Sequence, residues 1–533
     1  MSGRDPHRWL RDARRVFARL PDLRMSRVPD APALPVRDPW PGDPARGARL
    51  LKGELELGGG VRGLRPGFWA EPSGPPLLRA AAHSFTWLRD LRALGTDAAR
   101  LRARALVSDW IATGASDPLA QRPDVAGARI AAWLGHYDFF FAAADDTFRQ
   151  KLMARLVSDA RALSAALPPE EIDARALTGF KGLIAAAVAL PEHGGFLLRA
   201  QRFLPQEIAR QVAADGSQGE RNPAALLAAL QDLTEIRALL QAAQAPPPAA
   251  LGPAIERMAG ALRCLRHGDG GLALFNGSKE DLPALIELVL TQAGRSGRMP
   301  SALPDGGFHR LAAGRTLVLA DCGAPPPPGL DHAAHAGTLS MEMSVGRERL
   351  IVNCGAFPAG GGEWRDATRA TAAHSTLVIA DVNSSELKPG GLGRRPTTVE
   401  VQRQEANGAH WLEASHDGWV KPFDAVHRRR LYLAESGEDL RGEDTVEAAI
   451  PQPFTIRFHL HPTVHANLQQ DGGAVLLRLP GGGGWRLRAD GALVSVEESI
   501  YLGGPEQRRA EQVVLTGYPD GPQHVKWAIS KVK

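Results

Sequence analysis

The hydrophobic periodicity of this chain changes once, near residue 300, and that change limits what the chain can fold into. From about 81 to 294, apolar residues recur with the helical period of about 3.6, as in Phe85, Leu88 and Leu91. From 298 to 533 they alternate with period 2, the pattern of strands with one buried face. A helical half followed by an all-β half is typical of an α + β multidomain protein.

The length of 533 residues exceeds one ordinary core, so we expect more than one domain. Residues 1–75 are rich in Pro, Arg and Gly and are predicted to wrap on the next domain. Residues 76–297 are predicted to form helix pairs at intervals that suit an incomplete α/α barrel. Residues 298–533, with short strands and Gly-rich turns, are predicted to form an antiparallel β-sandwich.

Charge and composition exclude several classes of partner and location. The 63 basic and 59 acidic residues give a net charge of +4, which is compatible with an acidic ligand but far from a nucleic-acid footprint. No apolar run is long enough for a membrane span. The N-terminus is basic and amphipathic without the apolar core of a signal peptide, and the three cysteines form no CxxC pair. We therefore expect a cytoplasmic protein, with the periplasm as the alternative.

Four histidines lie at the edges of predicted strands or at the starts of loops. If the strands pair as a meander, His335, Asn353 and His374 converge. An asparagine is a weak zinc ligand because it lacks the charge of a carboxylate. The two histidines are equally suited to hold loops by hydrogen bonds, so both interpretations stay open. His309, on the first strand, is a further candidate.

The loop 215–223 (DGSQGERNP) connects two long predicted helices. Asn222 followed by Pro223 is a typical helix start, with Asn as the N-cap. In a second interpretation Gln218 and Arg221 bind an anionic group, the arginine through two parallel hydrogen bonds. Tyr137 lies in an apolar helix, where an aromatic residue is usually core but can also stack on a sugar. The chain has no GxGxxG, P-loop, GxSxG or HExxH motif.

The stretch DHAAHAGTLSMEMSVGRERLIVNCG at 331–355, followed by RATAAHSTLVIADVNSSEL, resembles the heparinase II/III-like family. ERNPAALLAALQDLTEIRALL at 220–240 looks like the helical domain of that family, and the resemblance extends over about 80–500. Among its members, the chain is most similar to the short bacterial ones of unassigned function. The resemblance implies an α/α toroid followed by an antiparallel β-sandwich, with substrate held between them.

The resemblance also implies a carbon–oxygen lyase that cleaves an anionic, uronate-containing polysaccharide or oligosaccharide by β-elimination, as in heparin, heparan sulfate or alginate. In such lyases an amide or an arginine neutralises the carboxylate, and a Tyr or His removes the acidified proton. On this sequence, the resemblance assigns carboxylate binding to Gln218, Arg221 and Asn222, and further substrate contacts to Arg369 and His332. It assigns the acid and the base to His335, His374 or His309. Tyr137 is the possible proton donor.

The sequence departs from the family pattern at several positions. The zinc positions fall on His335, Asn353 and His374, and because Asn353 replaces an acidic ligand, zinc is disfavoured and we expect no cofactor. Ala333 stands where the family has a catalytic histidine, and the helical-domain tyrosine has no clear counterpart. Two alternatives therefore stay open: a non-catalytic protein that binds acidic glycans on the same fold, and a glycoside hydrolase. The oligomeric state is not predicted. The obvious carboxylates for a hydrolase are Glu220, Asp269 and Glu363.

Overall fold

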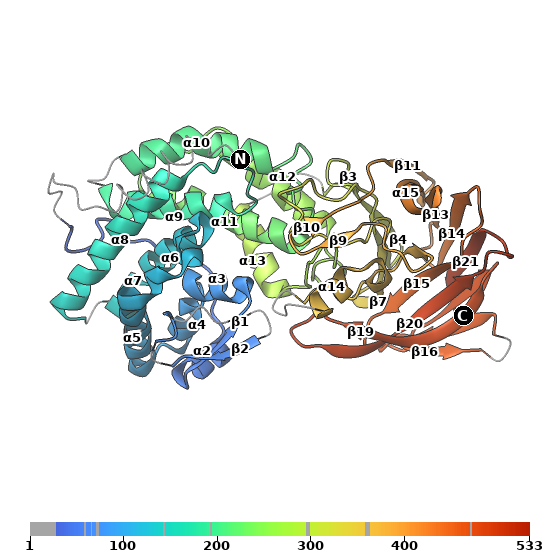
Figure 1. The fold of residues 1–533 in the computed structure, drawn as a ribbon, viewed down its shortest axis with the longest axis horizontal. Coiled ribbons are helices and arrows are strands. Elements are labelled where there is room, and N and C mark those ends of the chain that lie inside the picture. Colours follow the sequence, from blue (N-terminus) through green and yellow to red (C-terminus); the bar gives the residue numbers. More distant parts are fainter. Residues whose placement is uncertain are drawn as a thin grey trace, which may run out of the picture. The chain divides into compact units, whose positions relative to one another are not determined.

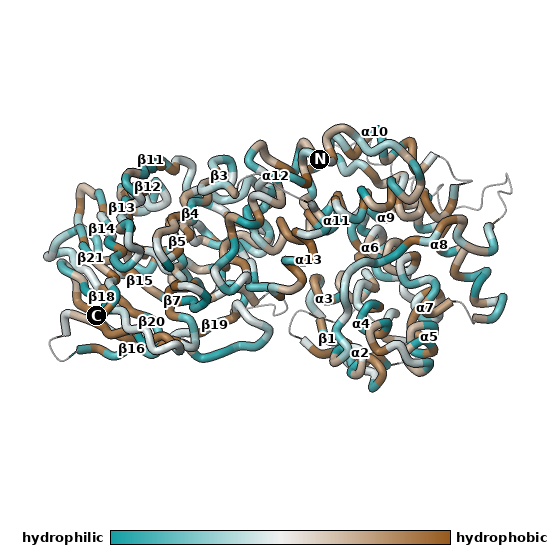
Figure 2. The backbone as a smooth tube through the Cα atoms, turned by 180° about the vertical axis from the view of Figure 1, so that it is seen from behind, coloured by the Kyte–Doolittle hydropathy of each residue, from teal (hydrophilic) through white to brown (hydrophobic). Residues whose placement is uncertain are grey.

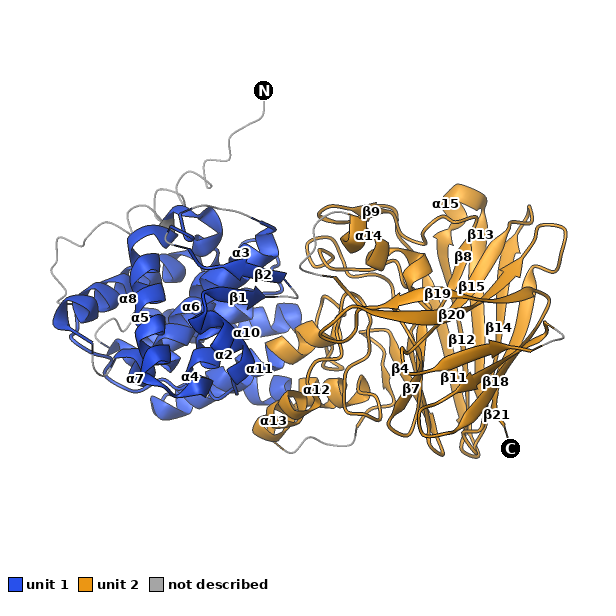
Figure 3. Cartoon of the chain, turned by 90° about the horizontal axis from the view of Figure 1, so that it is seen from below, with its two compact units in different colours: residues 1–211, 229–255 blue, residues 212–228, 256–533 orange. Residues whose placement is uncertain are grey.

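The chain is described here from a computed structural model, over residues 28–57, 60–65, 67–70, 74–141, 144–191, 195–294, 299–357, 363–469 and 472–532. It divides into two compact units (Figure 3). Unit 1 contains the described residues up to 211, together with 229–255. Unit 2 contains 212–228 and the described residues from 256 onward. The predicted domain limits at 75 and 297 stay predictions.

Unit 1 is a helical body (Figure 1). Its helices α6 (Pro123–Gly135) and α9 (Ala176–Ala189) cross with their backbones in contact, since a Cβ on Gly182 would lie 2.3 Å from the Cα of Gly127. Only glycine permits this approach. The other elements of unit 1 are α2 (Pro44–Leu51), β1 (Glu54–Leu57), β2 (Gly60–Gly63), α3 (Pro76–Ser84), α4 (Leu88–Leu94), α5 (Asp97–Thr113), the 3₁₀ turns η1 (Gly114–Ser116) and η2 (Pro118–Gln121), α7 (Tyr137–Phe141), α8 (Asp146–Ala166), α10 (Gly195–Gln211) and most of α11 (Pro223–Ala242).

The segment before α2 lies on the helices of unit 1. The backbone N–H of Ala33 donates to the carbonyl of Ala189 at 2.8 Å, and the indole of Trp40 donates to Glu235 at 2.5 Å. Glu235 also lies 3.3 Å from the Lys181 ammonium, which forms a buried ion pair with Asp232 at 2.7 Å. A buried ammonium is tolerated because it has both carboxylates. These contacts fix the extended N-terminal segment of the described chain.

Unit 2 consists mainly of two antiparallel sheets packed face to face. The eight-stranded sheet has the order β11-β12-β13-β14-β21-β18-β17-β16, and the nine-stranded sheet has the order β19-β20-β15-β7-β6-β5-β4-β3, with β8 also on β15. The strands are β3 (Ala302–Leu303), β4 (Phe308–Ala313), β5 (Thr316–Asp321), β6 (Met341–Val345), β7 (Glu348–Val352), β8 (Leu377–Ile379), β9 (Leu387–Lys388), β10 (Gly391–Leu392), β11 (Val399–Ala406), β12 (Ala409–Trp419), β13 (Ala425–Leu433), β14 (Asp439–Ala448), β15 (Phe454–Leu460), β16 (His465–Leu468), β17 (Ala474–Arg478), β18 (Gly484–Asp490), β19 (Leu493–Tyr501), β20 (Arg508–Gly517) and β21 (His524–Lys531). Its helices are α12 (Leu251–Cys264, from Glu256), α13 (Pro283–Ala293), α14 (Glu363–Arg369), η4 (Thr371–Ala373) and α15 (Val420–Phe423).

The predicted change of period is confirmed, because α13 ends at Ala293 and β3 begins at Ala302. Side chains that alternate along the strands fill one core between the two sheets. Figure 2 shows hydrophobic stretches along β15 and β20, two neighbouring strands of the nine-stranded sheet. The predicted α + β multidomain class is confirmed. Across the described residues, no helix combines the length and the apolar character that crossing a membrane requires.

The interior of the sandwich also holds charges. Asp444 on β14 is fully buried and accepts hydrogen bonds from His427 at 2.7 Å and from Arg429 at 2.7 Å, both on β13. The indole of Trp527 on β21 donates to its second oxygen at 2.8 Å. The guanidinium and the other hydrogen bonds hold the pKa of Asp444 well below its ordinary value, although burial alone would raise it. One carboxylate therefore ties three neighbouring strands together.

We expect Asp444→Ala to lower the free energy of unfolding of unit 2 by about 3–5 kcal/mol, because the buried Arg429 guanidinium loses its counter-charge. Chemical denaturation followed by circular dichroism measures the effect. Glu443→Ala is the control, since the adjacent Glu443 points to the opposite, solvent-facing side of β14, and its effect should stay within about 0.5 kcal/mol. Equal losses in the two variants would contradict the assignment.

Candidate functional site

The loop before α11 places Arg221 in the interior of unit 2. Its backbone has a left-handed φ of 53°, and its Nε donates to the carbonyl of Gly306 at 2.7 Å. Its Nη2 forms a close ion pair with Asp321 at the end of β5, and its guanidinium carbon lies 4.9 Å from the centre of the Phe308 ring. The positive charge predicted to bind a substrate carboxylate is therefore paired with a carboxylate of the chain itself.

The two amides of the same loop make local hydrogen bonds. Asn222 Oδ1 accepts from the backbone N–H groups of Ala224 at 2.8 Å and Ala225 at 3.2 Å, so the predicted N-cap of α11 is confirmed. Asn222 Nδ2 donates to the carbonyl of Asn276 at 2.9 Å. Gln218 is buried, and its Oε1 accepts from the backbone N–H of Glu220 at 2.9 Å. Both amides shape the backbone of the loop.

Asn276 connects this loop to His335. Its Nδ2 donates to the carbonyl of Arg221 at 3.1 Å and lies 3.3 Å from Asp321, while its Oδ1 accepts from the backbone N–H of His335 at 3.4 Å. Asn276 has a φ of 50°, a region that asparagine enters more easily than most residues. Residues far apart in the sequence thus meet around one asparagine side chain.

His335 and His374 contact each other, although β8, which follows His374, pairs with β15 and not with β7 as the predicted meander would require. His335 Nδ1 lies 3.0 Å from His374 Nε2, and His374 Nδ1 donates to the carbonyl of Ala370 at 2.8 Å. His374 Nε2 is then the acceptor and His335 Nδ1 the donor of their shared hydrogen bond. Burial lowers the pKa of His374 to about 4 and holds the pKa of His335 well below its ordinary value, so both imidazoles are neutral at pH 7.

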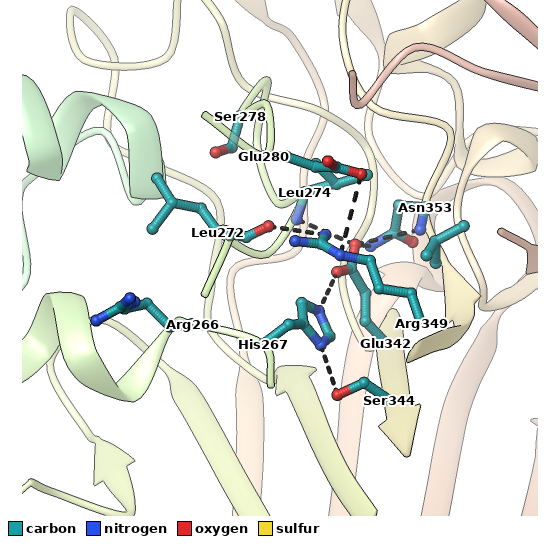
Figure 4. Close-up of polar contacts among 12 residues, drawn as sticks. Arg266, His267, Leu272, Leu274, Ser278, Glu280, Glu342, Ser344, Arg349 and Asn353 are labelled. Carbon is teal, nitrogen blue, oxygen red and sulfur yellow. Dashed lines mark hydrogen bonds and ion pairs between the residues drawn. The ribbon is translucent and has the colours of Figure 1, made fainter. Parts of the chain in front are cut away.

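A second buried network surrounds Glu342 on β6 (Figure 4). Glu342 Oε2 lies 2.7 Å from His267 Nε2, and His267 Nδ1 lies 3.0 Å from the hydroxyl of Ser344. Glu342 Oε1 accepts from the backbone N–H of Leu274 at 3.0 Å and from Nδ2 of Asn353 at 2.9 Å. Sequence reasoning did not identify this network. The sequence did contain a signal, because Glu342 stands between Met341 and Met343 on a predicted strand. A charged residue that is buried in this way needs hydrogen-bond partners.

The family's zinc positions do not fit a metal here. Asn353 Oδ1 accepts from the backbone N–H of Ser375 at 2.9 Å, and its Nδ2 is bonded to Glu342. Only the nitrogens of His335 and His374 then face each other, whereas a structural zinc site takes four ligands. Within the described ranges, no three His, Cys, Asp or Glu side chains are grouped so that they could hold a metal ion.

Of the remaining predicted site residues, Arg369 lies beside the histidine pair, where its charge adds to burial in lowering the pKa of His335. Arg369 is buried and donates to three backbone carbonyls, those of Ala334, Lys388 and Gly391. His332 is exposed, and its carbonyl accepts from Arg365 at 2.8 Å. His309 on β4 is buried, which lowers its pKa to about 4. Tyr137 lies on α7 in unit 1, and burial raises its pKa to about 12. For the hydrolase alternative, Asp269 is paired with Arg349 at 2.7 Å.

Comparison with known proteins identifies the family to which this fold belongs. Residues 295–528 match the family described as Heparinase II/III-like, C-terminal. FtsZ-localized protein C of Caulobacter vibrioides (strain NA1000 / CB15N) is 32% identical over 523 residues, which cover 93% of this chain and 89% of that protein. The chain belongs to the heparinase II/III-like family. The resemblance predicted from residues 331–355 is thereby confirmed.

Solved structures agree with the heparinase II/III-like assignment. The crystal structure of heparinase III matches with a TM-score of 0.72 at 13% identity, covering 99% of this chain and 90% of that one. Heparan sulfate lyase HepC from Pedobacter heparinus matches with a TM-score of 0.60 at 17% identity, covering 99% and 88%. The predicted α/α toroid followed by an antiparallel β-sandwich is confirmed. At these identities the likeness concerns the fold and not the chemistry.

The buried histidines predict a pH dependence of stability. The pKa of His374 is about 4 in the folded chain and near 6.5 when unfolded, so the unfolded chain binds more protons between these values. The neutral state of His374 therefore makes its full contribution to the free energy of unfolding above pH 6.5. This contribution is lost as the pH falls towards 4. We expect His374→Gln to reduce the loss of unfolding free energy between pH 7 and pH 5 by about 1–2 kcal/mol relative to wild type.

Denaturation at a series of pH values measures this difference. His332→Gln is the matched control, because its side chain is exposed, and its pH dependence should follow wild type. If His374→Gln lost stability between pH 7 and pH 5 as steeply as wild type, the neutral, buried state of His374 would be refuted.

Proposed function

We propose that this chain is a binding protein that localises with FtsZ and uses the heparinase II/III-like fold without elimination chemistry. The proposal rests above all on the Arg221–Asp321 ion pair, which engages the cation that a lyase would offer to its substrate. It is supported by the identity to FtsZ-localized protein C over 93% of the chain. We further propose that the chain acts in the cytoplasm, as its sequence leads us to expect.

Elimination next to a uronate requires a donor or cation that is free to neutralise the carboxylate. The Arg221 guanidinium already contacts Asp321, the carbonyl of Gly306 and the ring of Phe308. Releasing it would leave the Asp321 charge buried without a partner, which costs several kcal/mol. Gln218 and Asn222 similarly hold backbone groups. These contacts support a structural use of the carboxylate-binding positions.

A general base must come within hydrogen-bond reach of the proton that it removes. His335 and His374 are 4% and 1% exposed, and each uses one ring nitrogen for the other. Their ring contact therefore supports a role in holding the 331–337 loop against the 370–376 segment. The same two residues, neutral and fixed, suit a rigid scaffold.

We expect a fluorescent fusion of the full chain to concentrate where FtsZ concentrates in the source cells and to disperse when FtsZ is depleted. Purified full chain should bind purified FtsZ in biolayer interferometry. A variant of the histidine pair, His374→Gln, should keep the same localisation, because the proposal gives these histidines no part in recognition. A diffuse fusion together with no binding in vitro would refute the proposal.

A second candidate is a lyase that cleaves a uronate-containing anionic glycan by β-elimination. The observation that favours it is that Arg221, His335 and His374, which were predicted as substrate and acid–base residues, gather around Asn276 in one region of unit 2. In this mechanism a neutral imidazole takes the proton next to the carboxylate, and an acid protonates the leaving oxygen.

We expect a flat ultraviolet absorbance trace at the band of the unsaturated uronate product, over a panel of heparin, heparan sulfate and alginate. The reason is that both imidazoles are buried and the Arg221 guanidinium is already paired with Asp321. A rise that His335→Ala abolishes, in a variant with wild-type circular dichroism, would establish the lyase instead. Calorimetry on the same glycans tests the alternative of binding without cleavage.

A further inference from the structure

The outer face of the eight-stranded sheet carries a row of side chains that the candidate site does not use. The strand register places Gln404 opposite Trp411, Trp411 opposite Tyr432, and Tyr432 opposite Arg441. Arg441 is in turn opposite Ala528, and Ala528 is opposite Arg488. We call these six residues the arginine–aromatic band. From Trp411 to Arg488 the band crosses four strand spacings, about 19 Å.

The side chains of the band point away from the sandwich core. Their neighbours Leu412, Leu431, Leu440 and Leu487 are all buried in that core, and successive side chains of a strand point to opposite faces. Trp411 is 40% exposed, which makes it one of the most exposed large aromatic side chains of unit 2. A solvent-facing Trp beside a Tyr is not needed for the core of either sheet.

The two aromatic residues form a contact with a cation at its end. The rings of Trp411 and Tyr432 have centroids 5.1 Å apart at an angle of 45°. The guanidinium carbon of Arg441 lies 6.0 Å from the centroid of Tyr432, and Asp439 holds this arginine at 2.7 Å. Ring contacts of this kind limit the rotamers of all three side chains. These contacts restrict the side chains at the aromatic end of the band in the absence of a partner.

The other end of the band is basic. Arg488 lies on the same face as two further arginines, Arg478 on β17 and Arg486 on β18, and within the described part of the chain none of the three has a recorded ion pair. Lys526 on β21 lies opposite Glu443 and Asp490, so it belongs to a row of mixed charge. By contrast, Arg430 in the next row is paired with Glu413 at 2.8 Å and Glu443 at 3.4 Å. The three arginines without a recorded ion pair thus lie at one end of the band.

We propose that the arginine–aromatic band is the docking surface for an acidic segment of a protein partner, and this rests on the proposed function. Trp, Tyr and Arg are the residues that most often dominate the energy of protein interfaces. The aromatic pair provides the apolar anchor, and the unpaired cations attract acidic side chains. A nucleic acid fits less well, because the chain's net charge is only +4.

The test uses the purified full chain with two probes: FtsZ of the source organism and a fluorescein-labelled polyglutamate peptide. The variant Trp411→Ala/Arg488→Glu alters both ends of the band, and its outward side chains leave the core intact. We expect its affinity for each probe to fall at least about tenfold. Added salt should weaken wild-type binding, since unpaired surface charges are screened.

Tyr518→Ala/Arg509→Glu is the matched control. Tyr518 is 52% exposed, and Arg509 is an exposed residue of β20, in the other sheet. This variant makes the same kinds of change outside the band, so it should bind both probes like wild type. An equal loss of affinity in the control would mean that removing any exposed aromatic residue and reversing any exposed arginine weakens binding. That result would overturn the proposal.

The two probes separate the failure of the docking surface from the failure of the proposed function. FtsZ binding that the band variant leaves unchanged overturns the docking surface alone. Polyglutamate binding that depends on the band, without FtsZ binding by wild type, supports the acidic-segment surface and refutes the proposed function. Band-dependent binding of heparin with no binding of either protein probe would assign the band to an acidic glycan and overturn the proposal.

Discussion

The pairing of Arg221 with Asp321 is the interaction on which the centre of unit 2 depends. A buried guanidinium needs a counter-charge and acceptors, and here they come from β5 and from the turn before β4. The surrounding chain makes room for it: a Cβ on Gly323 would lie 2.3 Å from Arg221 Nη2, and one on Gly307 would lie 2.2 Å from the Cα of Gly323. Gly307 and Gly323 are therefore explained by the close packing beside this arginine.

Features that depend on neighbouring residues in the sequence predicted the helices and strands correctly, and their order along the chain indicated the fold. The change from period 3.6 to period 2 found the boundary between helices and strands, and Asn222 identified a helix start, because both depend on neighbouring residues only. The partner of Arg221 was out of reach because it lies 100 residues further along the chain. Glu342 was missed for a related reason. Its partners His267, Leu274 and Asn353 come from three segments that only the folded sheet brings together.

The same polar residue types can serve a lyase or stabilise a core, and the difference lies in which groups they face. His335 and His374 converge as a catalytic pair would, yet they face each other. Arg221 occupies a substrate-binding position but faces Asp321, and Asn353 occupies a zinc position but faces Glu342 and Ser375. Motif positions are therefore weaker evidence of chemistry than the partner that each side chain has in the fold.

The buried charge of Asp444 also affects the arrangement of side chains on the outer face of the eight-stranded sheet. Asp444 bonds His427 and Arg429 on β13 and Trp527 on β21, so the relative register of three strands is fixed from within. Tyr432, Arg441 and Ala528 stand on the outer side of these same strands. Because strand register sets the spacing of outward side chains, the internal network holds the arginine–aromatic band at a constant geometry. A surface whose side-chain spacing is fixed in advance loses less entropy on binding, which favours recognition by the outer face of this sheet.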